Sequence, residues 1–374
     1  MAAIRRKKSS VKTLEGIFLQ AARLQRRGLL KRLWRLQAMG RQAIGSELRR
    51  RKFQRKNGLP APTAIAFSPT MRCNLSCTGC YARDYPTDNE VPADVIDRML
   101  SSAEKMGVFL SIITGGEPLM RDGILDVFQR HRRVLFLLIT NGTLLDKQAA
   151  RKISRSGNVV PVVSLEGYRE HTDARRGGGV HDQVERAMDY LQREGVVFGF
   201  SATVASDNFE ILISDRFMDE MAKRGCALGF YTEYVPIGSA AQWELVLRQE
   251  EQKRFRKRIQ QLRREKPMML VHLPDDEYWG DNKCRAVING SVHINAEGYV
   301  EACPFAHFAS DNIKEKSLDQ ALRSRFLTEL RSSDATVRRG RLGCALVENR
   351  ELLQGIAAET GAKPTDGSHT RLGG

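Results

Sequence analysis

Apolar runs alternate with amphipathic segments along this chain from residue 64 onward. Near-continuous apolar runs predict six strands, at residues 64–68, 109–114, 134–140, 159–164, 197–204 and 227–234. Segments with helical spacing follow them, at about residues 92–106, 122–132, 146–156, 181–195, 209–224 and 249–265. Apolar strands separated by helices are typical of a parallel sheet covered on its outer face. The pattern therefore predicts an α/β protein whose core, residues 58–268, is a partial (β/α)6 barrel of the TIM type.

The first 57 residues have a different character. They contain 18 Lys or Arg and only two acidic residues, and so account for the whole net charge of +16. Apolar residues recur at helical spacing, among them Leu14, Ile17, Leu33 and Trp34. This composition predicts a basic amphipathic helical extension over residues 1–57.

Two interpretations of this extension are close in weight. Its apolar stripe either packs on the barrel with the cations in solvent, or lies in an anionic membrane interface as a peripheral contact. Nucleic acid is the least favoured partner. The sequence contains no stretch of 18 apolar residues that is free of charged side chains. It therefore predicts no membrane-spanning helix.

Three closely spaced cysteines, Cys73, Cys77 and Cys80, form a C-x3-C-x2-C run directly after the first predicted strand. A structural zinc site would need a fourth ligand nearby, and the next histidine is His131. A [4Fe–4S] cluster held by three thiolates leaves one iron with an open position. The chain has seven cysteines in all, an odd number that indicates metal binding in a reducing compartment more than a disulfide framework.

This run, followed by Gly115-Gly116-Glu117-Pro118 at the end of the second predicted strand, resembles the radical S-adenosylmethionine (radical SAM) superfamily. The resemblance implies a (β/α)6 barrel, and a [4Fe–4S] cluster coordinated by the three cysteines and by SAM. It also implies reductive cleavage of SAM to methionine and a 5′-deoxyadenosyl radical, with a reduced flavodoxin or ferredoxin as electron donor. Chemistry in such barrels lies at the carboxyl ends of the strands, where both motifs fall.

The same resemblance implies which residues contact SAM. The two glycines bring backbone close to its amino group, and Glu117 and Pro118 shape that turn. Ser164 and Glu166, after the fourth strand, are similar to a pair that contacts its carboxylate and ribose. The cofactor-binding prediction is therefore Tyr81, Gly115, Gly116, Glu117, Pro118, Asn141, Ser164, Glu166 and Arg176, with Arg175 as a further candidate.

Several of these residues have ordinary alternatives, and the chain departs from the family at one point. Asn141 precedes a glycine and is equally well explained as a turn residue, and the arginines as solvated surface. The residue before the third cysteine is often aromatic in the family and contacts adenine, but here it is Gly79. We expect Tyr81 to supply the ring instead.

The region 269–350 contains a second set of cysteines. Cys284 and Cys303 fit a C-x(9–15)-G-x4-C pattern through Gly298, which resembles the opening of SPASM and twitch extensions. The residues between them predict a β-hairpin that turns at Glu297-Gly298. With Cys344 as a third ligand, we expect one auxiliary iron–sulfur cluster, the fourth ligand being His307, substrate or unknown. Residues 351–374 are predicted to be a C-terminal tail.

Cys226 is expected to be a buried structural thiol. We expect Tyr231, Glu233, Tyr234 and the loop 275–278 to line the far side of the cavity. These patterns predict an iron–sulfur oxidoreductase that abstracts a hydrogen atom from an unidentified substrate, with catalytic side chains unknown. A peptide or protein maturase is favoured because of the SPASM-like cysteines, and the alternative is a membrane-lipid modifying enzyme recruited by residues 1–57. The expected location is cytoplasmic, with a peripheral site at the inner membrane face under that alternative.

Overall fold

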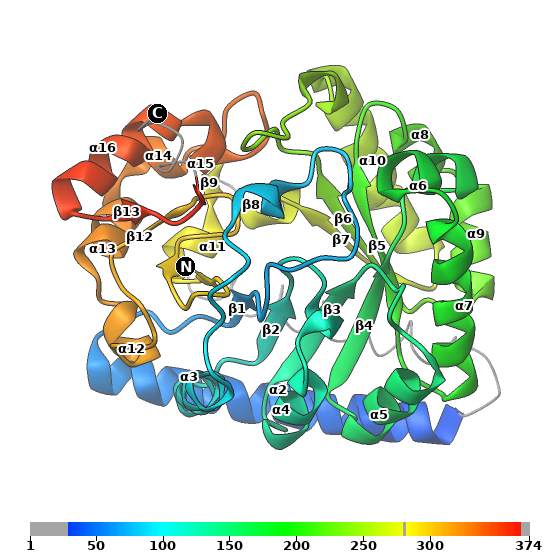
Figure 1. Cartoon of the computed structure of the whole chain (residues 1–374), viewed down its shortest axis with the longest axis horizontal. Coiled ribbons are helices and arrows are strands. Elements are labelled where there is room, and N and C mark those ends of the chain that lie inside the picture. Colours follow the sequence, from blue (N-terminus) through cyan, green and yellow to red (C-terminus); the bar gives the residue numbers. More distant parts are fainter. Residues whose placement is uncertain (1–28, 280–281, 368–374) are drawn as a thin grey trace, which may run out of the picture.

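The computed structural model describes residues 29–279 and 282–367, and its centre is a nine-stranded sheet of order β11-β10-β1-β2-β3-β4-β5-β6-β7 (Figure 1). All neighbouring strands from β10 to β7 in this order are parallel, and only β11 is antiparallel. The strands of this sheet are β1 (Ala64–Phe67), β2 (Leu110–Ile113), β3 (Leu135–Thr140), β4 (Val159–Ser164), β5 (Gly199–Val204), β6 (Leu228–Glu233), β7 (Met269–Leu273), β10 (His293–Ile294) and β11 (Val300–Glu301).

The six predicted strands are confirmed as β1 to β6, and they form the expected open half-barrel. The sequence missed strand β7, and it predicted β10 only as one arm of a hairpin and not as a parallel neighbour of β1. β7 pairs with β6 beyond the predicted core boundary at residue 268, and the two-residue strand β10 pairs with β1 at the opposite edge. The C-terminal region is therefore built onto the same sheet as the core.

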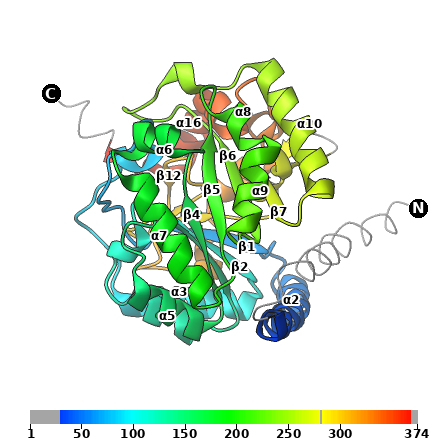
Figure 2. The same ribbon diagram turned by 90° about the vertical axis from the view of Figure 1, so that its right-hand side faces the viewer.

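Helices cover the outer face of this half-barrel (Figures 1 and 2). α3 is representative, because Val95, Ile96 and Met99 are buried at helical spacing and Gly107, with φ of 82°, ends the helix. The predicted helix 209–224 is two helices, because Ser214 caps the second by accepting the Phe217 N–H. The helices of the core are α3 (Ala93–Met106), α4 (Ile124–Arg130), α5 (Lys147–Ser156), α6 (Arg169–Arg176), α7 (Val180–Arg193), α8 (Phe209–Leu212), α9 (Asp215–Lys223) and α10 (Gln249–Glu265), with short 3-10 turns η1 (Tyr81–Asp84), η2 (Pro118–Met120), η3 (Trp243–Leu245) and η4 (Asp275–Glu277).

The described part of the basic extension is one long helix, α2 (Leu29–Asn57), which packs against α3. The contact is close, since a Cβ at Gly107 would lie 2.4 Å from the Ser46 carbonyl oxygen. On the opposite side, Ile44 and Leu48 are 63% and 64% exposed. The expectations for Leu14 and Ile17 fall outside the described residues. Within the described ranges, no helix has the length and apolarity needed to cross a bilayer.

The C-terminal region contains the predicted hairpin and a small helical layer. β10 and β11 pair antiparallel around Gly298, whose φ is 92°. The helices pack beside this edge of the sheet, in the orange and red part of Figure 1. The remaining elements are β8 (Tyr278–Trp279), β9 (Lys283–Cys284), α11 (Arg285–Ile288), β12 (Phe308–Ala309), α12 (Leu318–Ala321), α13 (Arg325–Ser332), α14 (Asp334–Val337), α15 (Ala345–Glu348), α16 (Arg350–Thr360) and β13 (Lys363–Pro364).

Candidate functional site

The cysteine loop after β1 packs against the glycine turn after β2. The Gly116 N–H donates to the Thr70 carbonyl oxygen at 3.0 Å, and the Glu117 N–H to the Arg72 carbonyl oxygen at 2.8 Å. A Cβ at Gly116 would lie 2.2 Å from that Arg72 oxygen, and one at Gly115 would lie 2.5 Å from the Thr70 oxygen. The two glycines are therefore required for one backbone segment to approach another, before any ligand is considered.

Glu117 joins the ends of β2 and β3. Its buried carboxylate accepts the Thr140 hydroxyl at 2.8 Å, the Asn141 N–H at 2.7 Å and the Leu119 N–H at 3.1 Å. Burial raises the pKa of Glu117 despite these hydrogen bonds, which act to lower it. Glu117 and Pro118, which begins η2, thus shape the turn as expected.

Asn141 is more than a turn residue, because its side chain reaches the cysteine loop. Its Nδ2 donates to Asn74 Oδ1 at 2.9 Å and lies 3.9 Å from Cys73 Sγ. Its Oδ1 accepts the Thr143 N–H at 2.9 Å. Asn141 therefore orients the loop that carries the first cysteine, and direct contact with SAM remains a prediction.

Glu166 forms a buried ion-pair cluster with two arginines. Its Oε1 accepts from Arg175 Nη1 and Arg176 Nη2, both at 2.6 Å, and its Oε2 accepts the Thr203 N–H at 3.0 Å. Oε1 thus accepts three hydrogen bonds and Oε2 only one, so Oε2 retains an acceptor site and the ribose contact stays a prediction. Ser164 Oγ lies 2.9 Å from Ser201 Oγ, and both serines line the cavity.

The arginines favour the thiolate form of the second cysteine. Burial raises the pKa of the Cys77 thiol, whereas Arg176 and Arg175 act to lower it. The buried Arg175 Nε has no hydrogen-bond partner among the described residues. Buried donors of this kind suit an anionic group such as a carboxylate, so the residues present fit the predicted cluster and cofactor.

The departure from the family at Gly79 has a structural reason. A Cβ at Gly79, whose φ is 66°, would lie 2.6 Å from the ring of Tyr234, which follows β6. The Tyr234 hydroxyl accepts the Gln242 N–H at 2.8 Å and is held in place. Tyr81 lies beside the cavity, with its hydroxyl 2.9 Å from Thr114 Oγ1. Both tyrosines line the cavity, so either ring is a candidate for the adenine contact.

All six predicted cluster ligands line one cavity of about 530 Å³ at the carboxyl ends of the strands. Cys73, Cys77 and Cys80 come from the loop after β1. The second set is assembled from three separate places in the sequence, at the start of α11, after β11 and at the start of α15. This grouping brings together two sets of thiols that lie more than 200 residues apart in the sequence.

The three thiols of the second set interact electrostatically with one another, and their surroundings suit an anionic cluster. The Cys303 thiol interacts electrostatically with Cys344 and Cys284. Burial raises the pKa of Cys284 to about 12, so metal binding would have to displace the protons. Arg339, whose buried Nη2 has no hydrogen-bond partner in the described chain, lowers the pKa of Cys344 against the larger effect of burial. The Phe305 N–H donates to Cys303 Sγ at 3.2 Å, a contact that also suits a metal-bound thiolate.

Both ring nitrogens of His307 are hydrogen-bonded to other residues, so His307 is not available as the fourth ligand of this site. Its Nδ1 lies 3.0 Å from Asp366 Oδ2 and its Nε2 lies 3.0 Å from the Pro304 carbonyl oxygen. Burial acts to lower the pKa of His307, but the Asp366 hydrogen bond and the charge of Glu301 raise it overall. A ring with acceptors at both nitrogens is favoured as imidazolium, which cannot bind metal.

The other expectations for the cavity have mixed outcomes. Cys226 is fully buried away from it, as expected. The prediction that Tyr231 lines the cavity was wrong. Its hydroxyl donates to the Leu212 carbonyl oxygen in the helical layer at 2.9 Å. Glu233 does line the cavity, where its Oε1 lies 2.7 Å from Nε2 of the buried His272 on β7. His272 was missed, although a polar residue within the apolar run of β7 is a signal that could have found it.

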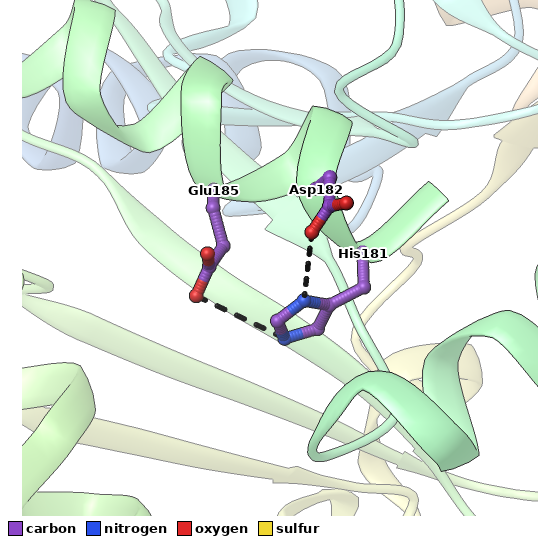
Figure 3. Close-up of side chains that lie close together, drawn as sticks. All are labelled: His181, Asp182 and Glu185. Atoms are coloured by element: carbon purple, nitrogen blue, oxygen red, sulfur yellow. Dashed lines mark ion pairs between the residues drawn. The ribbon is translucent and has the colours of Figure 1, made fainter. Parts of the chain in front are cut away.

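A separate cluster of ionisable side chains lies at the start of α7 (Figure 3). His181 Nδ1 is 3.9 Å from Asp182 Oδ1, and His181 Nε2 is 4.0 Å from Glu185 Oε1. Asp182 pairs with Arg169 at 2.8 Å, and Glu185 pairs with Arg224. The two guanidinium groups already balance both carboxylates, so this cluster carries no metal assignment.

Comparison with known proteins covers both the sequence and the fold. Residues 67–208 match the model of the Radical SAM superfamily. The Fe-coproporphyrin III synthase of Methanosarcina barkeri is 31% identical over 169 residues, which are 43% of this chain and 42% of that protein. The mycofactocin maturase MftC of Mycolicibacterium smegmatis is 30% identical over 193 residues, or 50% of this chain and 48% of that protein. The chain thus spans about half the length of these curated relatives.

Two solved structures share the fold at low sequence identity. Streptococcus suis SuiB bound to S-adenosylmethionine superposes with a TM-score of 0.64 and 17% identity, covering 83% of this chain and 75% of that one. anSMEcpe with bound AdoMet and a peptide superposes with a TM-score of 0.58 and 16% identity, covering 80% of this chain and 97% of that one. The likeness in fold therefore covers about four fifths of this chain.

Proposed function

We propose that this chain, which belongs to the radical SAM superfamily, holds a [4Fe–4S] cluster through Cys73, Cys77 and Cys80 and cleaves SAM reductively in the shared cavity. When bound, the cluster supplies the electron for that cleavage, which leads to removal of a hydrogen atom from a substrate. The chain's own residues bind the cluster and orient the loop that carries its ligands. Asn141 fixes the loop of the first cysteine, and the paired arginines favour the thiolate of the second.

We propose a peptide or protein as the substrate, in a maturase-type oxidation. One observation carries this proposal: both sets of three cysteines open into the same cavity. Cys284, Cys303 and Cys344 would hold an auxiliary cluster in the wall of the same cavity, where it could bind substrate or accept an electron. SuiB has been solved with a precursor peptide and anSMEcpe with peptides, and these structures share the fold.

The cavity also offers a place for the proton that an oxidation releases. Glu233 is buried at the end of β6 and hydrogen-bonded to His272, so the pair can hold a proton beside the substrate. The walls of the cavity are largely apolar side chains such as Ile112, Ile139 and Phe230. Such walls exclude water and protect reactive species from side reactions.

Anaerobic turnover tests the proposal. Reconstituted protein with SAM and a chemical reductant should form 5′-deoxyadenosine, and more of it with the true substrate class. Synthetic peptides from neighbouring genes form one arm, and iron-coproporphyrin III forms the second, because curated relatives include tetrapyrrole enzymes. Stimulation by the tetrapyrrole alone would refute the peptide assignment, and no deoxyadenosine in any arm would refute SAM cleavage.

A second candidate function rests on the exposed stripe of α2, defined by Ile44 and Leu48 with the neighbouring cations. Two large apolar side chains stand in solvent beside exposed Arg41, Arg51 and Lys52. This arrangement suits the interface of an anionic membrane and favours a lipid-modifying enzyme as the alternative.

The electron donor and the cellular compartment of this protein are proposed from the chemistry of its cysteines and clusters. We propose a reduced flavodoxin or ferredoxin as donor, because a small one-electron carrier must reach the cluster. All seven cysteines are free, which is consistent with a reducing, cytoplasmic environment.

A further inference from the structure

The second set of cysteines supplies three ligands, whereas closed iron–sulfur clusters take four. The fourth ligand decides whether this cluster transfers electrons only or also holds substrate on an open iron. Cys284, Cys303 and Cys344 all line the cavity, so a fourth ligand supplied by the protein would come from the same wall.

The acidic side chains around this wall are almost all neutralised by partners. Their pairings are Glu233 with His272, Asp275 with Arg256 and Arg339, Glu301 with His293 and Tyr85, and Glu348 with the backbone amides of Arg341 and Leu342. A carboxylate with such partners would have to break them in order to reach iron. The same holds for His307, which lies against Asp366 and Pro304.

Glu277 is the exception. It lies at the end of η4, lines the cavity and is only partly exposed, and no Lys, Arg or His within residues 29–279 and 282–367 pairs with it. The backbone amide of Ala286, which also lines the cavity, lies within hydrogen-bonding reach of both the Glu277 carboxylate and the Cys284 sulfur. An unpaired carboxylate in a largely apolar cavity is costly unless it meets a cation.

We propose that Glu277 is the fourth protein ligand of the auxiliary cluster, through a carboxylate oxygen on the iron that the three cysteines leave open. This inference rests on the auxiliary cluster proposed above. It makes that cluster fully ligated by protein and assigns substrate binding to the SAM side of the cavity. It also gives the acidic loop 275–277 separate roles, because Asp275 and Asp276 bind arginines while Glu277 lines the cavity together with the cysteines.

The test uses the full chain with Cys73, Cys77 and Cys80 replaced by Ala, so that only the auxiliary site can hold a cluster. This parent should bind about four iron ions per chain. Its Mössbauer spectrum should show one iron distinct from the other three, and imidazole should leave the EPR spectrum of the reduced cluster unchanged. Adding Glu277→Gln, which keeps the shape of the side chain but removes the anionic ligand, should make the EPR spectrum respond to imidazole. It should also make one iron labile to mild oxidation, with a three-iron cluster as the product.

Two controls locate the effect. Glu351→Gln removes an exposed acid on α16 and should behave as the parent. Tyr278→Phe removes the hydroxyl that accepts the Ala345 N–H at 2.8 Å and should leave the EPR spectrum insensitive to imidazole.

Three outcomes would overturn the proposal, and they are distinguishable. A parent cluster that already responds to imidazole has an open iron, and Glu277 is then not a ligand. Sensitivity that appears with Tyr278→Phe and not with Glu277→Gln assigns the ligand to the tyrosine. Absence of any cluster in the parent removes the auxiliary site itself, whereas SAM cleavage at the first site is measured separately in the wild-type chain.

Discussion

Gly116→Ala tests how the glycine turn supports the cysteine loop. The added methyl group would lie 2.2 Å from the Arg72 carbonyl oxygen and 2.5 Å from that of Met71. Both are backbone atoms, so a side-chain rotation cannot relieve the clash. The turn and the loop must separate, and the hydrogen bonds from Gly116 to Thr70 and from Glu117 to Arg72 are lost.

The magnitude follows from these contacts. Each lost hydrogen bond costs about 1 kcal/mol. Forcing a methyl group into a packed site costs about 1–3 kcal/mol more. The local penalty is thus about 3–5 kcal/mol, and even the lower value reduces the population of the cluster-binding loop conformation about 100-fold.

The assay compares Gly116→Ala with Gly178→Ala, which has no atom within 4 Å of its new Cβ. Iron content after anaerobic reconstitution and the free energy of unfolding in urea are measured for both. We expect the Gly178 variant to match wild type, and the Gly116 variant to lose the N-proximal cluster and unfold at lower urea. Equal iron content and equal stability for the two variants would refute the packing role of Gly116.

Three further predictions concern other parts of the chain. Glu166→Gln leaves two buried arginines without their anionic partner, so we expect the free energy of unfolding to fall by about 3–5 kcal/mol. SAM binding measured by equilibrium dialysis should also weaken. Unchanged values for both quantities would contradict the role of this ion-pair cluster. The raised pKa of His307 means that its ion pair stabilises the fold below the ordinary value of about 6.5 and is lost as pH rises through the raised value. Amide protection of residues 363–367, corrected for intrinsic exchange, should therefore fall with rising pH in wild type and stay flat in His307→Gln. Ile44→Ser with Leu48→Ser should weaken binding to anionic liposomes by about 2 kcal/mol, or about 30-fold, while Leu352→Ser, another exposed apolar site, should not; equal pelleting of all three proteins would exclude the membrane contact.

The half-barrel could be predicted because its strands are buried on both faces and read as continuous apolar runs. Strand β7 and the parallel pairing of β10 with β1 escaped prediction because their local sequence patterns are weak. β10 has two residues and owes its place to pairing with β1, while β7 lies beyond the expected core and contains His272. Pairing of this kind is decided by tertiary contacts, which the local pattern does not contain.

The candidate site was predictable where its residues follow strands directly. Cys73 and Gly115 are placed together because parallel strands end at the same edge of the sheet. The residues that pack against this site come from other parts of the sequence, and no motif spacing connects them with the cysteines or the glycine turn. Tyr234, which covers Gly79, and Arg339, beside Cys344, reach the cavity through loops that only the folded chain brings together.

For His307, one of the alternatives that the sequence left open as fourth ligand, a distant partner decides the role of the side chain. Its place four residues after Cys303 made ligation reasonable, but Asp366 arrives from the C-terminal segment and engages the ring. The sequence placed Glu277 at the far side of the cavity only as part of the loop 275–278, because nothing in a run of three acids distinguishes one from the next. Its lack of a cation partner emerges only when the pairing of its neighbours is known.

The central claim is that the iron left open by Cys73, Cys77 and Cys80 binds SAM. The most direct measurement is EPR of the reduced, reconstituted chain in which Cys284, Cys303 and Cys344 are replaced by Ala, recorded with and without SAM. We expect the spectrum of the remaining cluster to change on SAM addition, and 5′-deoxyadenosine to form. An identical spectrum in both samples, with no deoxyadenosine, would contradict the claim.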